Sequence, residues 1–382
     1  MSEPVLSVEH LSVEFQVASG RVRAVDDVSL TIPSGRVVGI VGETGCGKST
    51  LAQAIPRLLP EPPARIAAGR VVFRGTDLVK VPRGRLPLVR GTGIGMIFQE
   101  PLNSLNPAVK IYDQVAEAVL IRQWREAGVL PTFRGGPNPF DYSRRPLPET
   151  ATVLSRPIVP GGPAVERARR RLPGRVEVRR EVLDFLRLVR IQDPETILDC
   201  YPHELSGGMR QRIMIAMALS ERPSLLIADE PTSALDVTIQ AQVLTLMKEL
   251  IDETQASILF ISHDFGVIAE IADDLGVMYA GRLVEFGPVA EVFRSPRHPY
   301  TKGLLRAIPE RYKSEGPLAA IPGSVPSLAR LPPGCRYHPR CPLAQAVCRV
   351  DPPPVLTRTA ETAEGEIHRS ACHFTEGVAG LP

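Results

Sequence analysis

The sequence lacks several features that would place the protein within a membrane or on nucleic acid. No stretch approaches the roughly 18 uninterrupted apolar residues that a membrane-spanning helix needs. The start of the chain is too polar and acidic for a secretory signal, so we expect the protein to stay in the cytoplasm. The formal net charge is only +3 over 382 residues, which gives no protein-wide field that favours nucleic acid.

What is present is the composition of a folded globular protein. Hydrophobic residues make up 43% of the chain and charged residues 23%, which excludes a disordered or fibrous protein. The chain is longer than a domain with one ordinary hydrophobic core, so we predict two domains or one large domain with added segments. The six cysteines should be reduced in the cytoplasm, where clustered cysteines are more typical of a metal site than of disulfides.

Two kinds of strand pattern predict an α/β fold. Residues 5–32 contain alternating β-rich segments around a turn at residues 18–20, which is typical of an antiparallel sheet. Short apolar runs predict buried strands at residues 36–41, 224–228 and 257–262. Helical patterns lie at residues 210–221 and 236–253. Alternating strands and helices predict a parallel sheet, whose ligands bind at the carboxyl ends of the strands.

A glycine-rich motif follows the first apolar run and opens a helix near Lys48. Its residues are Gly42, Glu43, Thr44, Gly45, Cys46, Gly47, Lys48 and Ser49, followed by Thr50. A strand before this motif and a helix after it form the setting of a phosphate-binding loop. In such a loop the backbone N–H groups surround the phosphates, Lys48 reaches the β and γ phosphates, and Ser49 ligates Mg²⁺. The alternative is an incidental glycine turn before a helix.

The other two apolar runs end in polar residues that suit nucleotide hydrolysis. Asp229 follows the second run and can hold Mg²⁺ through water, and Glu230 beside it can polarise an attacking water. His263 follows the third run, in reach of a γ-phosphate at the same sheet edge. Solvated acids and a structural histidine are the alternative, and a phosphate loop in the same chain argues against it.

The segment Leu-Ser-Gly-Gly-Met at residues 205–209 precedes a predicted helix, and Ser206, Gly207 and Gly208 present a second set of backbone donors there. One chain needs only one phosphate cradle, so we expect this segment to close over the nucleotide of a partner subunit. With these motifs in this order, the sequence resembles the ATP-binding-cassette (ABC) family over residues 5–288.

The resemblance implies a nucleotide-binding domain at residues 1–290, with a RecA-like parallel sheet core, an antiparallel β subdomain and an α-helical subdomain at about residues 97–222. It also implies the roles of single residues. Phe15 would stack on the adenine, Gln99 would sense Mg²⁺ together with Ser49 and Asp229, and residues 233–236 would cross a dimer interface. Glu230 would be the catalytic base and His263 the γ-phosphate switch. The segment at residues 205–209 ends in Met209, where the commonest form of the family has Gln.

A segment rich in Pro, Gly and Arg, at about residues 123–175, interrupts the resemblance. Its composition predicts a solvated linker, and contact of its arginines with anionic lipid or a partner is the alternative. Residues 291–382 are rich in proline, so we predict a separate C-terminal appendage with little regular structure.

The C-terminal part of the sequence indicates which kind of cargo is transported. His-Pro-Tyr-Thr-Lys-Gly-Leu-Leu at residues 298–305 resembles the tail of bacterial oligopeptide and dipeptide importers. The resemblance implies a peripheral ATPase subunit on the cytoplasmic face of the membrane. Its partners would be a second, non-identical ATPase chain, two transmembrane permeases and an extracytoplasmic peptide-binding protein. Import of nickel or another small solute is one alternative. A soluble ATPase acting on nucleic acid is another, but neither a long coiled coil nor a second cassette is visible.

Four of the cysteines cluster in the same part of the sequence: Cys335, Cys341, Cys348 and Cys372, with the spacing C-x5-C-x6-C-x23-C. Four thiolates suit a structural metal in a segment with little core of its own. Tetrahedral sulfur ligands fit Zn²⁺ or an iron-sulfur cluster. The resemblance favours a [4Fe-4S] cluster, with zinc and then four free thiols as alternatives. Cys46 and Cys200 are expected to take no part in the metal site.

Overall fold

The computed structural model describes residues 4–18, 20–91, 93–99, 104–126, 174–232, 237–254, 256–307, 321–353, 356–361 and 367–381. The chain divides into two compact units. Residues 1–81, 224–233 and 247–382 form the first unit, and residues 82–223 and 234–246 form the second. Most of the inserted segment predicted at residues 123–175, and all of the loop predicted at residues 233–236, lie outside the described residues.

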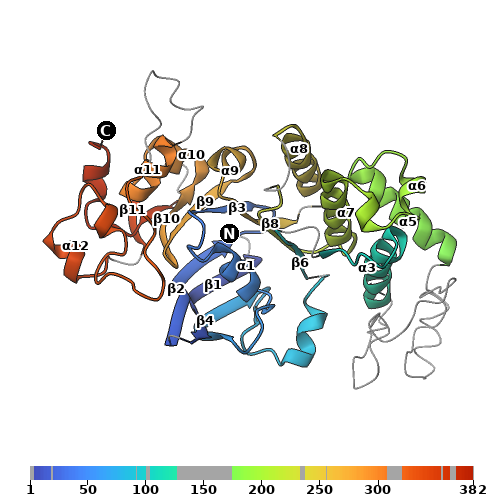
Figure 1. The fold of residues 1–382 in the computed structure, drawn as a ribbon, viewed down its shortest axis with the longest axis horizontal. Helices are drawn as coiled ribbons and strands as arrows, with labels where there is room; N and C mark the ends of the chain where they lie inside the picture. The colour runs from blue at the N-terminus through green and yellow to red at the C-terminus, as the bar shows by residue number, and fades with distance from the viewer. Residues whose placement is uncertain are drawn as a thin grey trace. The chain divides into compact units, whose positions relative to one another are not determined.

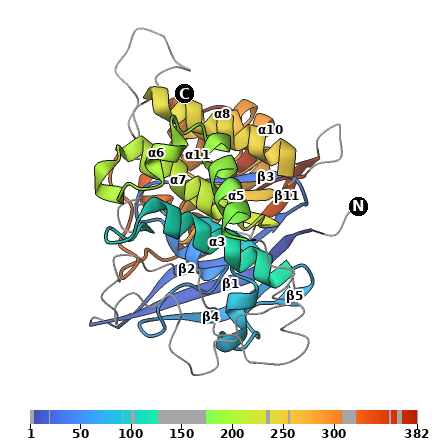
Figure 2. The same ribbon diagram turned by 90° about the vertical axis from the view of Figure 1, so that its right-hand side faces the viewer.

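An antiparallel sheet forms one part of the first unit, as the sequence predicts (Figures 1 and 2). Its four strands run in the order β2-β1-β4-β5, where β1 is Leu6–Val17, β2 is Gly20–Ile32, β4 is Ala64–Phe73 and β5 is Thr76–Asp77. Alternate side chains of β1, such as Leu6 and Val8, are fully buried and form the core of this part.

A second sheet carries the predicted parallel strands. Within the first unit its order is β11-β12-β10-β9-β3-β8-β7. The strands β3 (Val37–Val41), β7 (Leu225–Asp229) and β8 (Ser257–Ile261) are buried at every residue, which explains their unbroken apolar sequences. β3 also pairs in parallel with β9 (Asp274–Tyr279), so four parallel strands end at one edge.

Helices cover this sheet closely. α1 (Lys48–Ala54) contacts β7 and β8, and α9 (Phe265–Ile271) lies over β3 (Figure 1). The packing of α9 requires a glycine in β3, because a Cβ atom on Gly39 would lie 2.7 Å from Cγ2 of Ile268. α10 (Val289–Arg294) packs on β9 and on β10 (Arg282–Pro288), and α11 (Pro299–Arg306) follows it along the chain.

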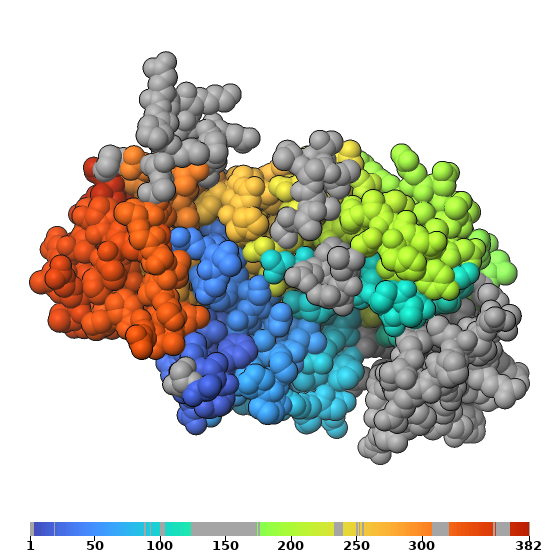
Figure 3. All heavy atoms as spheres, in the orientation of Figure 1, coloured from blue at the N-terminus to red at the C-terminus, as the bar shows by residue number. Residues whose placement is uncertain are grey.

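The C-terminal region has more regular structure than its proline content predicts, and it is not separate from the first unit. β11 (Thr357–Glu361) and β12 (Ile367–Ser370) form a hairpin, and β12 pairs antiparallel with β10. The short helix α12 (Ala346–Val350) precedes the hairpin. Figure 3 shows this region, in orange to red, lying directly against the blue N-terminal strands. The C-terminal region therefore extends the main sheet rather than forming an independent appendage.

The second unit is built mainly from helices. α3 (Ile111–Glu126), α5 (Arg175–Leu188) and α7 (Gly207–Ser220) pack against one another (Figure 2). The buried guanidinium of Arg122 holds them together, because its Nε donates to the Ser220 carbonyl at 2.8 Å and its terminal nitrogen pairs with Glu181. The unit also contains η1 (Arg83–Leu88), β6 (Ile94–Ile97), α6 (Pro194–Ile197) and η4 (Pro202–Glu204).

α8 (Val237–Thr254) begins in the second unit and ends in the first. Within the described ranges, no helix has the length and apolar character needed to cross a membrane.

A buried histidine fixes the start of α11. The Nδ1 atom of His298 accepts a hydrogen bond from the Tyr300 N–H at 3.1 Å, and its own backbone N–H donates to Glu285 at 2.9 Å. Burial lowers the pKa of His298 to about 3, so the ring is neutral and Nδ1 keeps its lone pair for the cap.

We expect this histidine to make the stability of the protein depend on pH. Its pKa is lower in the folded state than the value of 6.5 in the unfolded chain, so acid favours the unfolded state. Between pH 7.5 and 5.5 this group should remove about 1.4 kcal/mol from the free energy of unfolding. His298→Asn keeps a side-chain cap but does not titrate. Urea unfolding of both proteins at the two pH values should show a smaller loss for the variant, and equal losses would contradict this assignment.

Candidate nucleotide site

The predicted phosphate loop connects β3 to α1, with glycines where the backbone requires them. A Cβ atom on Gly42 would lie 2.3 Å from the carbonyl oxygen of Met278, and one on Gly47 would lie 2.3 Å from that of Ala24. Gly47 also has a φ of +106°, which side chains disfavour. Gly45 has a φ of +80°, but a Cβ atom there would meet nothing within 4 Å. The loop thus lies against backbone at Gly42 and at Gly47, and it is open at its tip.

Lys48 is turned back over this loop. Its Nζ atom donates to the carbonyl oxygen of Gly42 at 2.8 Å and to that of Glu43 at 3.3 Å. The same nitrogen lies 3.9 Å from Oε1 of Glu230, and the residue is only 5% exposed. This lysine places a buried positive charge inside the curve of the loop, where phosphates bind in such loops.

The predicted magnesium ligands meet beside Lys48. Ser49 Oγ donates to Asp229 Oδ1 at 3.1 Å, which joins the start of α1 to the end of β7. Burial raises the pKa of Asp229, and the neighbouring Glu230 raises it further, whereas the bond from Ser49 lowers it. A hydroxyl next to a buried carboxylate is the donor set that holds Mg²⁺ in phosphate-loop ATPases. These two side chains therefore fit that ion.

Glu230 and His263 complete the group. Glu230 has a φ of +48°, which is uncommon for a residue with a side chain, and its N–H donates to the Ile261 carbonyl at 2.9 Å. This conformation directs the carboxylate toward His263, whose Nδ1 lies 3.3 Å from Glu230 Oε2. Such strain is typical of functional positions. In the strand register Ile261 lies opposite both Ile40 and Asp229, so these polar residues share one sheet edge.

The remaining predicted nucleotide contacts are less closely grouped. Phe15 is half-buried on β1, opposite Ala64 of β4. Cys46 is buried beneath the loop and burial raises its thiol pKa, so its side chain faces the core rather than a ligand. Thr44 is exposed on the loop, and Thr50 is half-buried in α1.

Two predicted site elements belong to the second unit. Gln99 is exposed just after β6. Ser206 caps α7 by accepting the Met209 N–H at 3.3 Å, and it is exposed, as is Gly207, while Gly208 is half-buried. Ser206 and Gly207 at the start of this helix are therefore accessible to an outside ligand.

Two residues in contact with the loop were not predicted from the sequence. The N–H of Glu43 donates to the hydroxyl of Tyr300 at 3.0 Å, and the carboxylate of Glu43 pairs with Arg340. Tyr300 lies in the tail motif, and Arg340 directly precedes Cys341. No local pattern indicates either contact, because the partners are 257 and 297 positions apart.

The four clustered cysteines lie near one another. The pKa of Cys341 is raised to about 12, chiefly by burial and further by the thiols of the other three, Cys335, Cys348 and Cys372. The Phe374 N–H donates to the sulfur of Cys372 at 3.3 Å. Nevertheless, across the described parts of the chain, no three His, Cys, Asp or Glu side chains stand in an arrangement that could hold a metal. The iron-sulfur cluster therefore stays a prediction.

Two family models match the sequence. The model described as ABC transporter matches residues 25–233, and the model described as the oligopeptide/dipeptide transporter C-terminal region matches residues 284–348. The dipeptide transport ATP-binding protein of Bacillus subtilis is 40% identical over 361 residues, which cover 94% of this chain and 93% of that protein. A probable peptide ABC transporter ATP-binding protein of Sinorhizobium fredii is 41% identical over 99% of this chain and 97% of its own length.

Solved structures support the fold. A dimeric ATP-binding cassette in a post-hydrolysis state, bound to ADP and phosphate, matches with a TM-score of 0.56 and 21% identity. The match covers 74% of this chain and 98% of that one. Another match is cbiO1 from Clostridium perfringens, part of an ABC transporter complex, with a TM-score of 0.55, 24% identity and coverage of 82% and 97%.

The steric difference between two loop glycines gives a prediction for stability. Both Gly45→Ala and Gly47→Ala place a side chain at positive φ, which costs about 1 kcal/mol. Only Gly47→Ala also forces a Cβ atom against the Ala24 carbonyl. We expect it to lower the free energy of unfolding by about 3 kcal/mol. Urea unfolding of the two variants measures this difference, and equal losses would contradict the geometry described for the loop.

Proposed function

The chain belongs to the ABC transporter family of ATPases, and from this premise we propose that it powers import of dipeptides or oligopeptides across the cytoplasmic membrane. As a member of this family it hydrolyses ATP. The peptide cargo is supported by the match at residues 284–348 and by relatives named for peptide import. The observation that carries the ATPase assignment is the convergence of Lys48, Ser49, Asp229, Glu230 and His263 at one sheet edge.

We propose the following roles for these residues. The loop N–H groups and Lys48 bind the ATP phosphates, and Ser49 with Asp229 would hold Mg²⁺, which neutralises charge on the transferred phosphoryl group. Glu230 accepts a proton from the attacking water. Its carboxylate suits this role because it lies between Lys48, which binds the phosphates, and His263. His263 orients Glu230 and contacts the γ-phosphate. Phe15 is proposed to stack on the adenine.

The proposed catalytic unit contains two ATPase chains. Ser206 and Gly207 offer exposed donors at the start of α7, and we infer that they bind the γ-phosphate held by a second, related chain. ATP would then join the two chains, and its hydrolysis would release them. Gln99 is proposed to reach Mg²⁺ and to pass this motion to two membrane permeases. A peptide-binding protein on the outer side would deliver the cargo, so the chain would lie at the cytoplasmic face.

We also propose that the four clustered cysteines bind a metal, with a [4Fe-4S] cluster favoured over zinc. Each thiol near Cys341 raises its pKa, and the Phe374 N–H donates to the sulfur of Cys372 at 3.3 Å. Hydrogen bonds of this kind stabilise thiolates as metal ligands. A bound metal would cross-link the turn at Cys341 to α12 and to the end of β12, and so supply folding energy.

Substitution of the two central charged residues should separate binding from hydrolysis. Lys48→Ala removes the buried cation and should abolish measurable ATP binding. Glu230→Gln keeps the size of the side chain but removes the base, so ATP should bind normally while hydrolysis falls by about 100-fold or more. Phosphate release and binding of a fluorescent ATP analogue, measured with the partner subunits present, test both. A Glu230→Gln protein that hydrolyses ATP at the normal rate would show that another group is the base.

Spectroscopy and elemental analysis test the cysteine site. Protein purified without air should be brown with about four irons per chain, and Cys341→Ser should lose both the colour and the iron. Cys200→Ser is the matched control, because this cysteine lies in the second unit, and it should keep both. Colourless protein with one zinc per chain would show that the site binds zinc and not an iron-sulfur cluster. Protein that contains neither metal would exclude the site.

A further inference from the structure

Two side chains from the C-terminal region hold one residue of the phosphate loop. The guanidinium of Arg340 contacts both carboxylate oxygens of Glu43, with Nη1 2.7 Å from Oε2 and Nη2 3.1 Å from Oε1. The hydroxyl of Tyr300 accepts the backbone N–H of the same residue at 3.0 Å. Glu43 is therefore fixed through its side chain and its backbone at once. A paired guanidinium and carboxylate is among the strongest and most directional of polar contacts.

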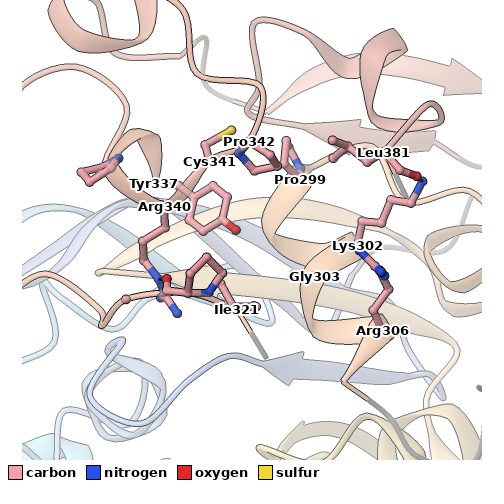
Figure 4. Close-up of a pocket in the computed structure, with 13 residues that line it drawn as sticks. Pro299, Lys302, Gly303, Arg306, Ile321, Tyr337, Arg340, Cys341, Pro342 and Leu381 are labelled. Carbon is pink, nitrogen blue, oxygen red and sulfur yellow. Dashed lines mark hydrogen bonds between the residues drawn. The ribbon is translucent and has the colours of Figure 1, made fainter. Parts of the chain in front are cut away.

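Arg340 is itself firmly placed. Its side chain is only 4% exposed, its Nε donates to the Pro322 carbonyl at 2.9 Å, and its guanidinium lies 5.8 Å from the ring centre of Tyr279. Arg340 precedes Cys341 on one turn, and Figure 4 shows the two side chains pointing in different directions. A cavity of about 460 Å³ lies beside this turn, bordered by Ile321, Tyr337 and both of these residues.

Tyr300 is placed by aromatic packing and by the helix that carries it. Its ring lies 4.6 Å from that of Tyr279 and 5.4 Å from that of Tyr337, measured between ring centres, and it is fully buried. The cap provided by His298 fixes the first turn of α11, and that turn directs the Tyr300 hydroxyl to the loop. The tail motif at residues 298–305 thus has a physical role at the nucleotide site.

The position of Glu43 matters because its carbonyl oxygen is one of the two that accept Lys48 Nζ. Rotation of Glu43 would move this oxygen and the neighbouring Gly42 carbonyl, so Lys48 would lose its position in the loop. We propose that Arg340 and Tyr300 are positioning residues for the phosphate loop, and that they set its affinity for nucleotide from the C-terminal region. The inference rests on the proposed nucleotide site and adds to it a dependence on residues outside the cassette core.

A merely structural role is the competing explanation, in which the same contacts anchor the C-terminal region without affecting nucleotide. Arg340→Gln removes the charge that pairs with Glu43, and Tyr300→Phe removes only the hydroxyl while keeping the ring packing. Arg330→Gln is the matched control, because Arg330 is exposed in the same region. Glu43→Gln, alone and combined with Arg340→Gln, shows whether the two residues act as a pair.

The experiment is equilibrium binding of a fluorescent ATP analogue to the full chain, with thermal unfolding of each variant measured in parallel. We expect Arg340→Gln to weaken binding roughly tenfold and Tyr300→Phe roughly fivefold, as loss of a charged and of a neutral hydrogen bond implies. Arg330→Gln should bind like the unmodified chain. The double variant should bind better than the product of its single effects predicts.

The possible results of these binding measurements test the nucleotide site and the positioning role separately. Failure of the unmodified chain to bind the analogue would overturn the nucleotide site itself. Normal binding by folded Arg340→Gln and Tyr300→Phe, even with lowered unfolding temperatures, would overturn the positioning role while leaving the site intact. If Arg340→Gln does not fold, Tyr300→Phe decides alone, because it removes one oxygen and no charge. Multiplicative effects in the double variant would show that Arg340 does not act through Glu43.

Discussion

The nucleotide site depends on a steric constraint, which is the close approach of the phosphate loop to backbone on two sides. Gly42 lies against the Met278 carbonyl at the end of β9, and Gly47 lies against the Ala24 carbonyl of β2. Only residues without a Cβ atom can occupy these two positions. The path that the loop then takes brings Lys48 onto its own loop carbonyls and brings Ser49 onto Asp229. The buried charge, the proposed metal ligands and the proposed base are grouped because the loop backbone follows this path.

The C-terminal region makes a second set of contacts with the same loop. β12 joins the main sheet beside β10, and Arg336 bonds to the Ala280 carbonyl and to Asp26 of β2. Asp26 keeps a lowered pKa despite its burial, because Arg23, Arg336 and Arg282 surround it. These contacts hold the cysteine-containing turn against the β-strands that border the loop. A region that resembles an appendage in composition is therefore part of the scaffold of the nucleotide site.

Local patterns predicted much of this structure, and long-range contacts account for what they missed. The sequence predicted the strands β3, β7 and β8, because a buried strand is an unbroken run of apolar residues. It also predicted the phosphate loop, because the glycines that the loop requires lie close together in the chain. The pairing of β12 with β10 and the contact of Arg340 with Glu43 were not predicted. The latter joins residues 297 positions apart, and the motifs in which Glu43 and Arg340 lie do not indicate that the two residues meet. Proline content also indicated less structure than the C-terminal region has, because composition does not report strand pairing.

The central claim is that ATP hydrolysis by this chain drives peptide uptake, and transport by the complete assembly tests it most directly. The measurement is entry of a labelled dipeptide into sealed vesicles that contain two permeases, a second ATPase chain and this protein, with a peptide-binding protein outside. We expect uptake that requires ATP on the cytoplasmic side and stops when Glu230 is replaced by Gln. ATP-dependent entry of labelled nickel with no entry of peptide would contradict the account.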